Sequence, residues 1–402
     1  MLAAERQALS PEAKLLFLAA AVSPGESAVR ESLSGGIDWA ELCFLAQHEN
    51  AASILVRLLD RVGADSNDSG YQKLRQLARI STMHMLQLEQ LLQQTIGILA
   101  RENIDTLLLK GAGLAYSAYS SFPDRPMGDI DLLVPAPHAE RAWSLLQTHG
   151  WTSSGMKIEM DRYSEHQHFP RLAREAGAFL LEIHAALLPE ENPFRFSTDA
   201  IWARARNETV KGQAMTIPHP IHQLWHACVH FAWSHAFQWG SWRTFRDVAA
   251  IVHRDSIEWP EFVAFALESR AATCCFWTLR LARRLAGAPV PDTVLRSLRP
   301  RYPEFILNRL EGHLLVSLFP SDDRCPSVRL TRRLWEAAIA PRWSGHGSSR
   351  PSHVTERWVQ RAGRRDPEPR VGVTLAERFR KMRAGGTYLL RVSRLSLPGD
   401  LA

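Results

Sequence analysis

Apolar residues recur every three or four positions along the first hundred residues, which is the spacing of amphipathic helices. The pattern is carried by PEAKLLFLAAAV from Pro11, by DWAELCFLAQHENAASILVRLLDRV from Asp38, and by a long stretch from Tyr71 to Glu102. Clusters of Ser, Gly, Asp and Pro, which are typical of loops, separate these stretches. The N-terminal part of the chain is therefore predicted to be helical.

The period of the pattern changes after about residue 100. Short apolar runs at 104–109 and 129–134 are bounded by turn-forming residues, which predicts two β-strands. GLAYSAY between them is long enough for about two helical turns, and the segment from Pro137 to Gly150 predicts a further helix. HFPRLAR and AFLLEIHAAL flank Glu175-Ala176-Gly177, which predicts a β-hairpin.

Helical patterns return after about residue 216 and continue to about residue 320. The remaining segment combines irregular stretches, PRWSGHGSSRPSH and RAGRRDPEPRVG, with two predicted short basic helices, LTRRLWEAAIA and LAERFRKMRA. The predicted fold class is α+β, with a small mixed-sheet core flanked by N- and C-terminal helical regions. The predicted divisions are a helical region at 1–99, an α/β core at 100–215, a helical region at 216–320 and a basic, partly irregular tail at 321–402.

Charge is distributed unevenly along the chain. The formal net charge is +6, but residues 321–402 contain 17 Lys and Arg against 8 Asp and Glu, so the rest of the chain carries −3. A basic surface for nucleic acid is therefore not expected on the core, whereas the tail suits an acidic partner or a membrane surface. Five scattered cysteines and the lack of an apolar run of about 20 residues favour a cytoplasmic location.

Asp129 and Asp131 belong to the second predicted strand, and their side chains project from the same side because successive residues of a strand alternate. Two neighbouring carboxylates repel each other unless a cation lies between them. Hard divalent ions such as Mg²⁺ bind carboxylate oxygens together with substrate phosphates. Glu182 is the only acid in its predicted strand and is the candidate third carboxylate of a site for two ions.

Two glycines and two cations lie close to these predicted strand ends. Gly111 and Gly113 allow the backbone to approach a phosphate at a helix N-terminus, where N–H groups point outward. Lys110 and Arg125 carry positive charges that suit the same polyphosphate.

The charged residues also have structural interpretations. Asp129 and Asp131 are suited to a solvated strand end. Asp131 is suited to accept a hydrogen bond from a backbone N–H, and Glu182 to pair with Arg171. Lys110 is suited to reach solvent along an apolar surface, and Arg125 to pair with a neighbouring acid. Four histidines share one predicted helix face, which suits a metal, an anion or a hydrogen-bonded core: His219, His222, His226 and His230.

The order of these residues resembles the polymerase-beta-like nucleotidyltransferase superfamily, and in particular its uncharacterised bacterial branch. Members of that branch have Lys-Gly after an apolar strand, then Arg-xxx-Asp-x-Asp-Leu-Leu-Val, a later Glu-Ile-His strand, and a His-rich helix before an Arg-xxx-Asp helix. The matching positions are Lys110-Gly111, Arg125 with Asp129 to Val134, Glu182 to His184, His226 with His230, and Arg243 with Asp247. The resemblance covers roughly residues 10 to 260.

This resemblance implies transfer of a nucleoside monophosphate from an NTP, such as ATP, to an acceptor hydroxyl or phosphate, with release of pyrophosphate. Asp129 and Asp131 would hold Mg²⁺, and Glu182 would bind the activating ion or orient the acceptor. The donor phosphates would contact Lys110, Gly111 and Arg125. The sequence does not select among a small molecule, a sugar and a peptide as the acceptor.

One departure from the wider superfamily keeps other functions open. The first motif of that superfamily is usually Gly-Ser or Gly-Gly, whereas this chain has Lys110-Gly111-Ala112-Gly113 and lacks the hydroxyl. A non-catalytic protein that senses a nucleotide or docks onto a partner is therefore an alternative, and so is a kinase-like phosphoryl transferase. Release of pyrophosphate, of a nucleoside diphosphate or of neither distinguishes the three.

Overall fold

A computed structural model describes residues 9–153, 167–190, 192–210, 212–238, 240–318, 325, 327–339, 375–393 and 395. The chain divides into two compact units. The sheet unit comprises residues 38–227 and 250–258, and the helical unit comprises residues 1–37, 228–249 and 259–402. The four divisions proposed from the sequence follow chain order and stay a prediction.

The helical unit is built around α12 (Ala272–Ala286), twelve residues of which are buried. Its other elements are α1 (Pro11–Ala20), α2 (Glu26–Ser34), η5 (His230–Ser234), α11 (Trp259–Glu268), α13 (Asp292–Leu298), α14 (Glu304–Ser317), α15 (Val328–Ile339) and α17 (Leu375–Val392). Helix α1 begins where the sequence predicts, because Ser10 caps the helix and Pro11 fills its first position. Helix α2 was missed, because the flanking Ser and Gly residues were interpreted as loop signals.

The two short basic helices predicted for the tail are confirmed as α15 and α17. Helix α17 packs closely on α14, since a side chain at Gly312 would lie 2.1 Å from the backbone oxygen of Val392. The irregular stretches predicted around residues 341–353 and 361–372 lie outside the described residues. No helix in the described part of the chain is both long enough and apolar enough to span a membrane.

The sheet unit begins with the helices predicted from the first hundred residues. These are α3 (Trp39–Glu49), α4 (Ala52–Val62) and the 33-residue α5 (Ser69–Arg101). The sequence pattern suggested one continuous helix from Asp38, but the chain breaks at Asn50, whose φ of 55° is left-handed. Asn adopts this conformation more readily than most residues and ends helices there.

Within the described residues, seven strands form one mixed sheet in the order β3-β4-β5-β2-β1-β7-β6. They are β1 (Leu107–Leu108), β2 (Ile130–Leu133), β3 (Thr152–Ser153), β4 (Leu172–Arg174), β5 (Phe179–His184), β6 (Arg206–Val210) and β7 (Gln213–Ile217). Central strand β2 runs parallel to β5 and antiparallel to β1. The predicted α+β class is therefore confirmed.

Helices and short 3-10 turns connect the strands of the sheet unit. They are α6 (Lys110–Ser117), η1 (Phe122–Asp124), η2 (Ala136–His138), α7 (Ala139–Thr148), η4 (Glu175–Gly177) and α8 (Thr198–Ala203). Helices α9 (Pro220–Val229) and α10 (Ser241–Arg254) each cross from one unit into the other along the chain. The predicted hairpin is confirmed, and its turn is the left-handed η4 between β4 and β5.

The hairpin of β6 and β7 was not recognised from the sequence. Its β6 strand lies at the edge of the sheet, and its residues alternate between half-buried and exposed. An edge strand needs no apolar run, so RNETV gives a weak strand signal. Gly212, with a φ of 80°, lies in the connection between the two strands.

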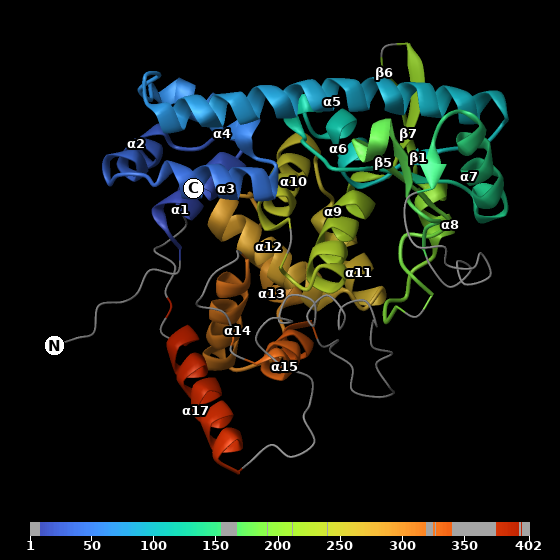
Figure 1. The fold of residues 1–402 in the computed structure, drawn as a ribbon. Helices are drawn as coiled ribbons and strands as arrows, with labels where there is room; N and C mark the ends of the chain where they lie inside the picture. The colour runs from blue at the N-terminus through green and yellow to red at the C-terminus, as the bar shows by residue number, and fades with distance from the viewer. Residues whose placement is uncertain are drawn as a thin grey trace. The chain divides into compact units, whose positions relative to one another are not determined.

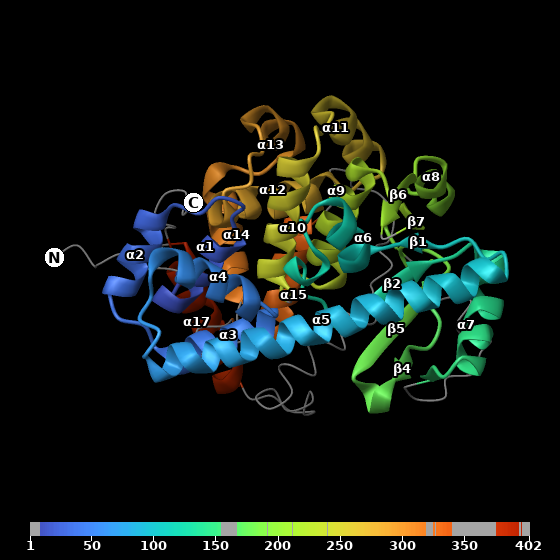
Figure 2. The same cartoon turned by 90° about the horizontal axis from the view of Figure 1, so that it is seen from above.

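The two faces of the sheet differ in chemistry. Ile130 and Leu132 of β2 and Leu181 and Ile183 of β5 belong to one apolar core with residues of α5 and α7. Figures 1 and 2 show α5 running along this side of the strands, with α7 beside it. Side chains of a strand alternate, so the residues between these apolar positions project from the opposite face. That face carries the polar residues predicted to be functional.

Candidate functional site

Three acids lie on the polar face of β2 and β5. Parallel pairing places Asp131 directly opposite Glu182, and Asp129 precedes β2 by one residue. Asp131 and Glu182 are buried, whereas 36% of the Asp129 side chain is exposed. The sheet therefore brings together the three carboxylates singled out from the sequence.

Lys110 faces Asp131 from the first position of α6. Its Nζ lies 2.6 Å from Oδ1 of Asp131, and its backbone has a left-handed φ of 44°. Burial lowers the pKa of the Lys110 ammonium, but the neighbouring carboxylates, chiefly Asp131, outweigh burial and raise the pKa. Lys110 is therefore a firmly protonated partner of Asp131, at the helix N-terminus where a phosphate contact was predicted.

Arg171 pairs with Glu182 from the residue just before β4. Its Nε and Nη2 donate to Oε1 of Glu182 over 3.0 and 2.6 Å, and Nη2 lies 3.8 Å from Oδ2 of Asp129. This contact is the structural alternative weighed for Glu182 from the sequence. The guanidinium end of the site is partly open, because 45% of the Arg171 side chain is exposed.

His184 completes the polar cluster and was not proposed as a site residue from the sequence. Its Nε2 lies 2.8 Å from Oδ1 of Asp131 and 3.5 Å from Oε2 of Glu182. Strand alternation provided a signal, because residues 182 and 184 must project from the same face. Among the described residues, one group of three brings metal-binding atoms within 4.8 Å of one another: Asp131, Glu182 and His184.

The acids differ in their protonation. Burial raises the pKa of Asp131, but Lys110 and the hydrogen bond to His184 outweigh burial and hold this pKa below its ordinary value. The pKa of Glu182 is also lowered, because its hydrogen bond with His184 and nearby positive charges outweigh burial. Partial burial and the charge of Asp131 raise the pKa of Asp129 to about 6. Asp129 is therefore the carboxyl that carries most of the mutual repulsion.

The metal-free Asp129→Asn variant should be more stable than the wild type above pH 6 and should lose this advantage as the pH falls toward 4. A raised pKa means that the folded state holds the proton more tightly than the unfolded state, so wild-type stability declines as pH rises through this window. Asparagine does not ionise and escapes that decline. Melting temperatures measured with a chelator at pH 5 and pH 7.5 test this. An advantage that grows as pH falls would contradict it.

Gly111, which follows Lys110, packs against Arg125 and Met127. A side chain at Gly111 would lie 3.2 Å from Nη1 of Arg125 and 3.1 Å from the sulfur of Met127. Arg125 is buried, and its Nη1 donates to the carbonyl of Pro126 over 2.7 Å. These contacts give Gly111 and Arg125 a packing role, alongside the phosphate role predicted for them.

The Gly113→Ala variant should be destabilised. A Cβ at this position would lie 2.4 Å from the backbone oxygen of Leu108, so overpacking costs about 1–3 kcal/mol, against a gain of about 1 kcal/mol in helix propensity. Gly97→Ala in α5 is the matched control, because its Cβ would meet only a side-chain nitrogen at 3.9 Å. Urea unfolding of both variants measures the difference. Equal stabilisation of the two would contradict close packing at Gly113.

The predicted histidine face reaches the site through His226. His222 and His226 are buried in α9, and burial, followed by the charges of Lys110 and His184, lowers the pKa of His226 to about 3. His226 is therefore a neutral imidazole on the edge of the cluster. His219 precedes α9, and His230 lies in the helical unit.

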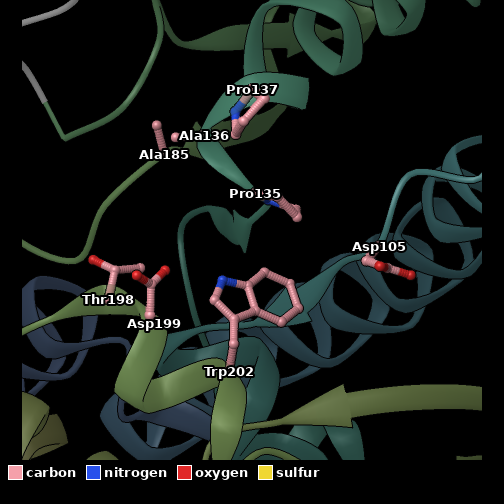
Figure 3. A pocket seen from close by; sticks show the side chains of 8 residues that line it. All are labelled: Asp105, Pro135, Ala136, Pro137, Ala185, Thr198, Asp199 and Trp202. Carbon is pink, nitrogen blue, oxygen red and sulfur yellow. The ribbon is translucent and has the colours of Figure 1, made fainter.

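A cleft lies beyond the carboxyl ends of β2 and β5. Its volume is about 450 Å³, and Pro135 and Ala185 line it directly after these strands. Figure 3 shows Trp202 of α8 pointing into the cleft, with Asp199 and Asp105 on opposite sides. The remaining lining residues are Ala136, Pro137 and Thr198. The cleft thus combines an aromatic ring with hydrogen-bonding groups, which is typical of small-molecule sites.

Comparison with known proteins adds one finding. A family model described as an uncharacterised nucleotidyltransferase matches residues 35–287. The matched stretch is more than half of the 402 residues and contains the polar cluster of the sheet unit. No curated protein and no solved structure matches the chain significantly.

Proposed function

Because this chain belongs to the family of uncharacterised nucleotidyltransferases, we propose that it transfers a nucleoside monophosphate from an NTP to an acceptor and releases pyrophosphate. One observation carries the proposal. The parallel pairing of β2 with β5 aligns Asp131 with Glu182, beside Asp129 and the first turn of α6. Carboxylates grouped next to a helix N-terminus suit a metal-bound triphosphate.

The donor set fits Mg²⁺. Two buried carboxylates and a third half-exposed one supply the oxygen ligands that this ion prefers, and triphosphate oxygens and water complete its shell. Asp129, Asp131 and Glu182 would hold two ions. Such ions neutralise the charge on the transferred phosphoryl group and activate the attacking oxygen.

Lys110 has two partners in this proposal. Without a ligand it neutralises Asp131, and with NTP bound its charge also faces the donor phosphates. The acceptor oxygen forms a bond to the α-phosphorus while the bond from that phosphorus to the β-bridging oxygen breaks. Pyrophosphate leaves with the bridging oxygen, and the proton of the acceptor hydroxyl passes to solvent. The protein contributes positioning and charge neutralisation, which phosphoryl transfer chiefly requires.

The cleft beyond β2 and β5 is the proposed acceptor site. It follows His184 directly at Ala185, so the strand that carries Glu182 also leads into the cleft. Trp202 offers a ring for stacking, and Asp105 and Asp199 offer acceptors for hydroxyl or amino groups. A polar small molecule with a ring therefore suits the cleft better than an extended apolar chain.

The experiment that tests the function compares NTPs carrying label on the α- or the γ-phosphate, with pools of sugars, peptides and small metabolites as acceptors. Nucleotidyl transfer attaches the α-label to an acceptor and releases pyrophosphate. Transfer of the γ-label with release of a nucleoside diphosphate would establish the kinase-like alternative. Mass analysis of the labelled product then identifies the acceptor.

A non-catalytic nucleotide-binding role has one observation in its favour. Each buried acid already pairs with a cation of the same chain, Asp131 with Lys110 and Glu182 with Arg171. Such pairs stabilise a site that no longer needs a metal. NTP binding that is unchanged by a chelator, with no turnover in any acceptor pool, would favour this role.

A further inference from the structure

The imidazole of His184 points into the space between two carboxylates. We propose that His184 is a direct metal ligand, so that one ion position is a mixed site of Asp131, Glu182 and His184 that prefers a first-row transition ion to Mg²⁺. This inference rests on the proposed metal-dependent function and specifies which kind of ion occupies one of the two proposed metal positions. The other position, next to Asp129, keeps oxygen ligands alone.

The distances around Nε2 match those between ligands of one ion. Nε2 lies 2.8 Å from Oδ1 of Asp131 and 3.5 Å from Oε2 of Glu182. Metal bonds to nitrogen and oxygen are about 2.0–2.2 Å long, so ligands at right angles on one ion are about 3 Å apart. All three atoms lie within 4.8 Å of one another, so small side-chain shifts, with Nζ of Lys110 withdrawing from Oδ1 of Asp131, would bring them onto a common centre.

The fold fixes this orientation. Strand β5 places Glu182 and His184 on one face, and its parallel register with β2 sets them beside Asp131. The His184 side chain is 1% exposed, so little water competes for its nitrogen. Within the described residues no hydrogen-bonding group contacts Nδ1 of His184, which leaves that nitrogen free to carry the proton when Nε2 binds a metal.

The choice of ion follows from ligand chemistry. Mg²⁺ takes oxygen ligands almost exclusively, whereas imidazole nitrogen suits first-row transition ions. A buried nitrogen among two carboxylates therefore penalises Mg²⁺ most strongly relative to the later ions of the row, and least relative to Mn²⁺, which also binds oxygen ligands well. A site made only of the carboxylates of Asp131 and Glu182 would not have this preference for transition ions over Mg²⁺.

His168 provides a matched control. Its ring lies 5.2 Å from the ring of His184, and its Nδ1 donates to the carbonyl of Phe169 over 2.8 Å. It is therefore a neighbouring imidazole on the same face that stands outside the group of mutually close ligand atoms. A His168→Gln substitution changes the surroundings without removing a proposed ligand.

The test uses Mn²⁺ as the probe on the full chain without nucleotide. Pulsed electron paramagnetic resonance should detect ¹⁴N coupling to bound Mn²⁺ in the wild type and in His168→Gln. Incorporation of ¹⁵N-histidine should replace that signal with ¹⁵N coupling. This measurement uses the wild-type protein, so it does not depend on whether a variant folds. His184→Gln should lose the coupling, and its preference for Mn²⁺ over Mg²⁺ in competition titrations should fall below that of the wild type.

Bound Mn²⁺ without nitrogen coupling would overturn the ligand role of His184, and the proposed nucleotidyl transfer would stand on the carboxylates alone. Coupling that survives in His184→Gln and disappears in His168→Gln would also overturn it. Failure of the proposed function would give a different result. The chain would then turn over no NTP with any divalent ion, whether or not nitrogen coupling to Mn²⁺ is detected.

Discussion

The Asp131→Asn variant should lose turnover by about 10²–10³-fold and should unfold at a lower temperature than the wild type. Oδ1 of Asp131 contacts both Nζ of Lys110 and Nε2 of His184, so this carboxylate is the centre of the cluster. Asparagine keeps the shape and removes the charge. Loss of a charge-assisted contact in a buried setting costs about 1.5–3 kcal/mol of folding free energy. Turnover and urea unfolding measure the two effects separately.

Asp129→Asn is the control for this prediction. Asp129 precedes β2, is partly exposed and has a raised pKa, so loss of its charge relieves repulsion and gives up only the 3.8 Å contact with Arg171. Both substitutions should reduce turnover, but only Asp131→Asn should reduce metal-free stability. Equal stability changes in the two variants, or wild-type turnover in Asp131→Asn, would contradict the central position of Asp131.

The positions of these two acids could be predicted from the sequence, but the difference between them could not. Strand alternation placed Asp129 and Asp131 on one face, and the position of Glu182 in an isolated apolar run made it the third candidate. The sequence pattern alone does not distinguish the two aspartates. Their pKa values shift in opposite directions because Lys110, at the start of α6, contacts Asp131. This contact depends on the tertiary fold, so no local sequence pattern predicts it.

The contacts of Arg171, which the sequence offered only as a structural partner of Glu182, and of His184, which it missed, depend on strand register. Arg171 and His184 reach the acids because β4 pairs with β5 and β5 pairs with β2. Register between strands is set by packing across the whole sheet. The alternation of side chains along β5 therefore predicts the face on which His184 lies, but not the residues of other strands that it contacts. For Gly113, a predicted helix N-terminus suggested a phosphate contact, which stays a prediction, and the structure adds close packing on Leu108.

The Glu182→Gln variant should keep NTP binding and lose turnover by about 10²–10⁴-fold, the range for removal of a group that activates the attacking oxygen. Glu182 lies opposite Asp131, so a glutamine there leaves the site's shape and its other charges in place. Stability should fall by about 1.5–3 kcal/mol, because Arg171 and the buried His184 both exchange a charged acceptor for a neutral one. The thermal shift produced by NTP with Mg²⁺ reports binding.

Arg171→Gln separates the two interpretations of Glu182. If Glu182 only anchors Arg171, either substitution removes or weakens the same two hydrogen bonds, and both variants should lose a similar amount of stability while keeping turnover. If Glu182 acts on the acceptor or its ion, Arg171→Gln should retain far more activity than Glu182→Gln. The double variant should then resemble Glu182→Gln in turnover, because the activating carboxylate is already absent. Wild-type turnover in Glu182→Gln, together with a matched loss of stability in both single variants, would assign this acid to the fold and remove it from the reaction.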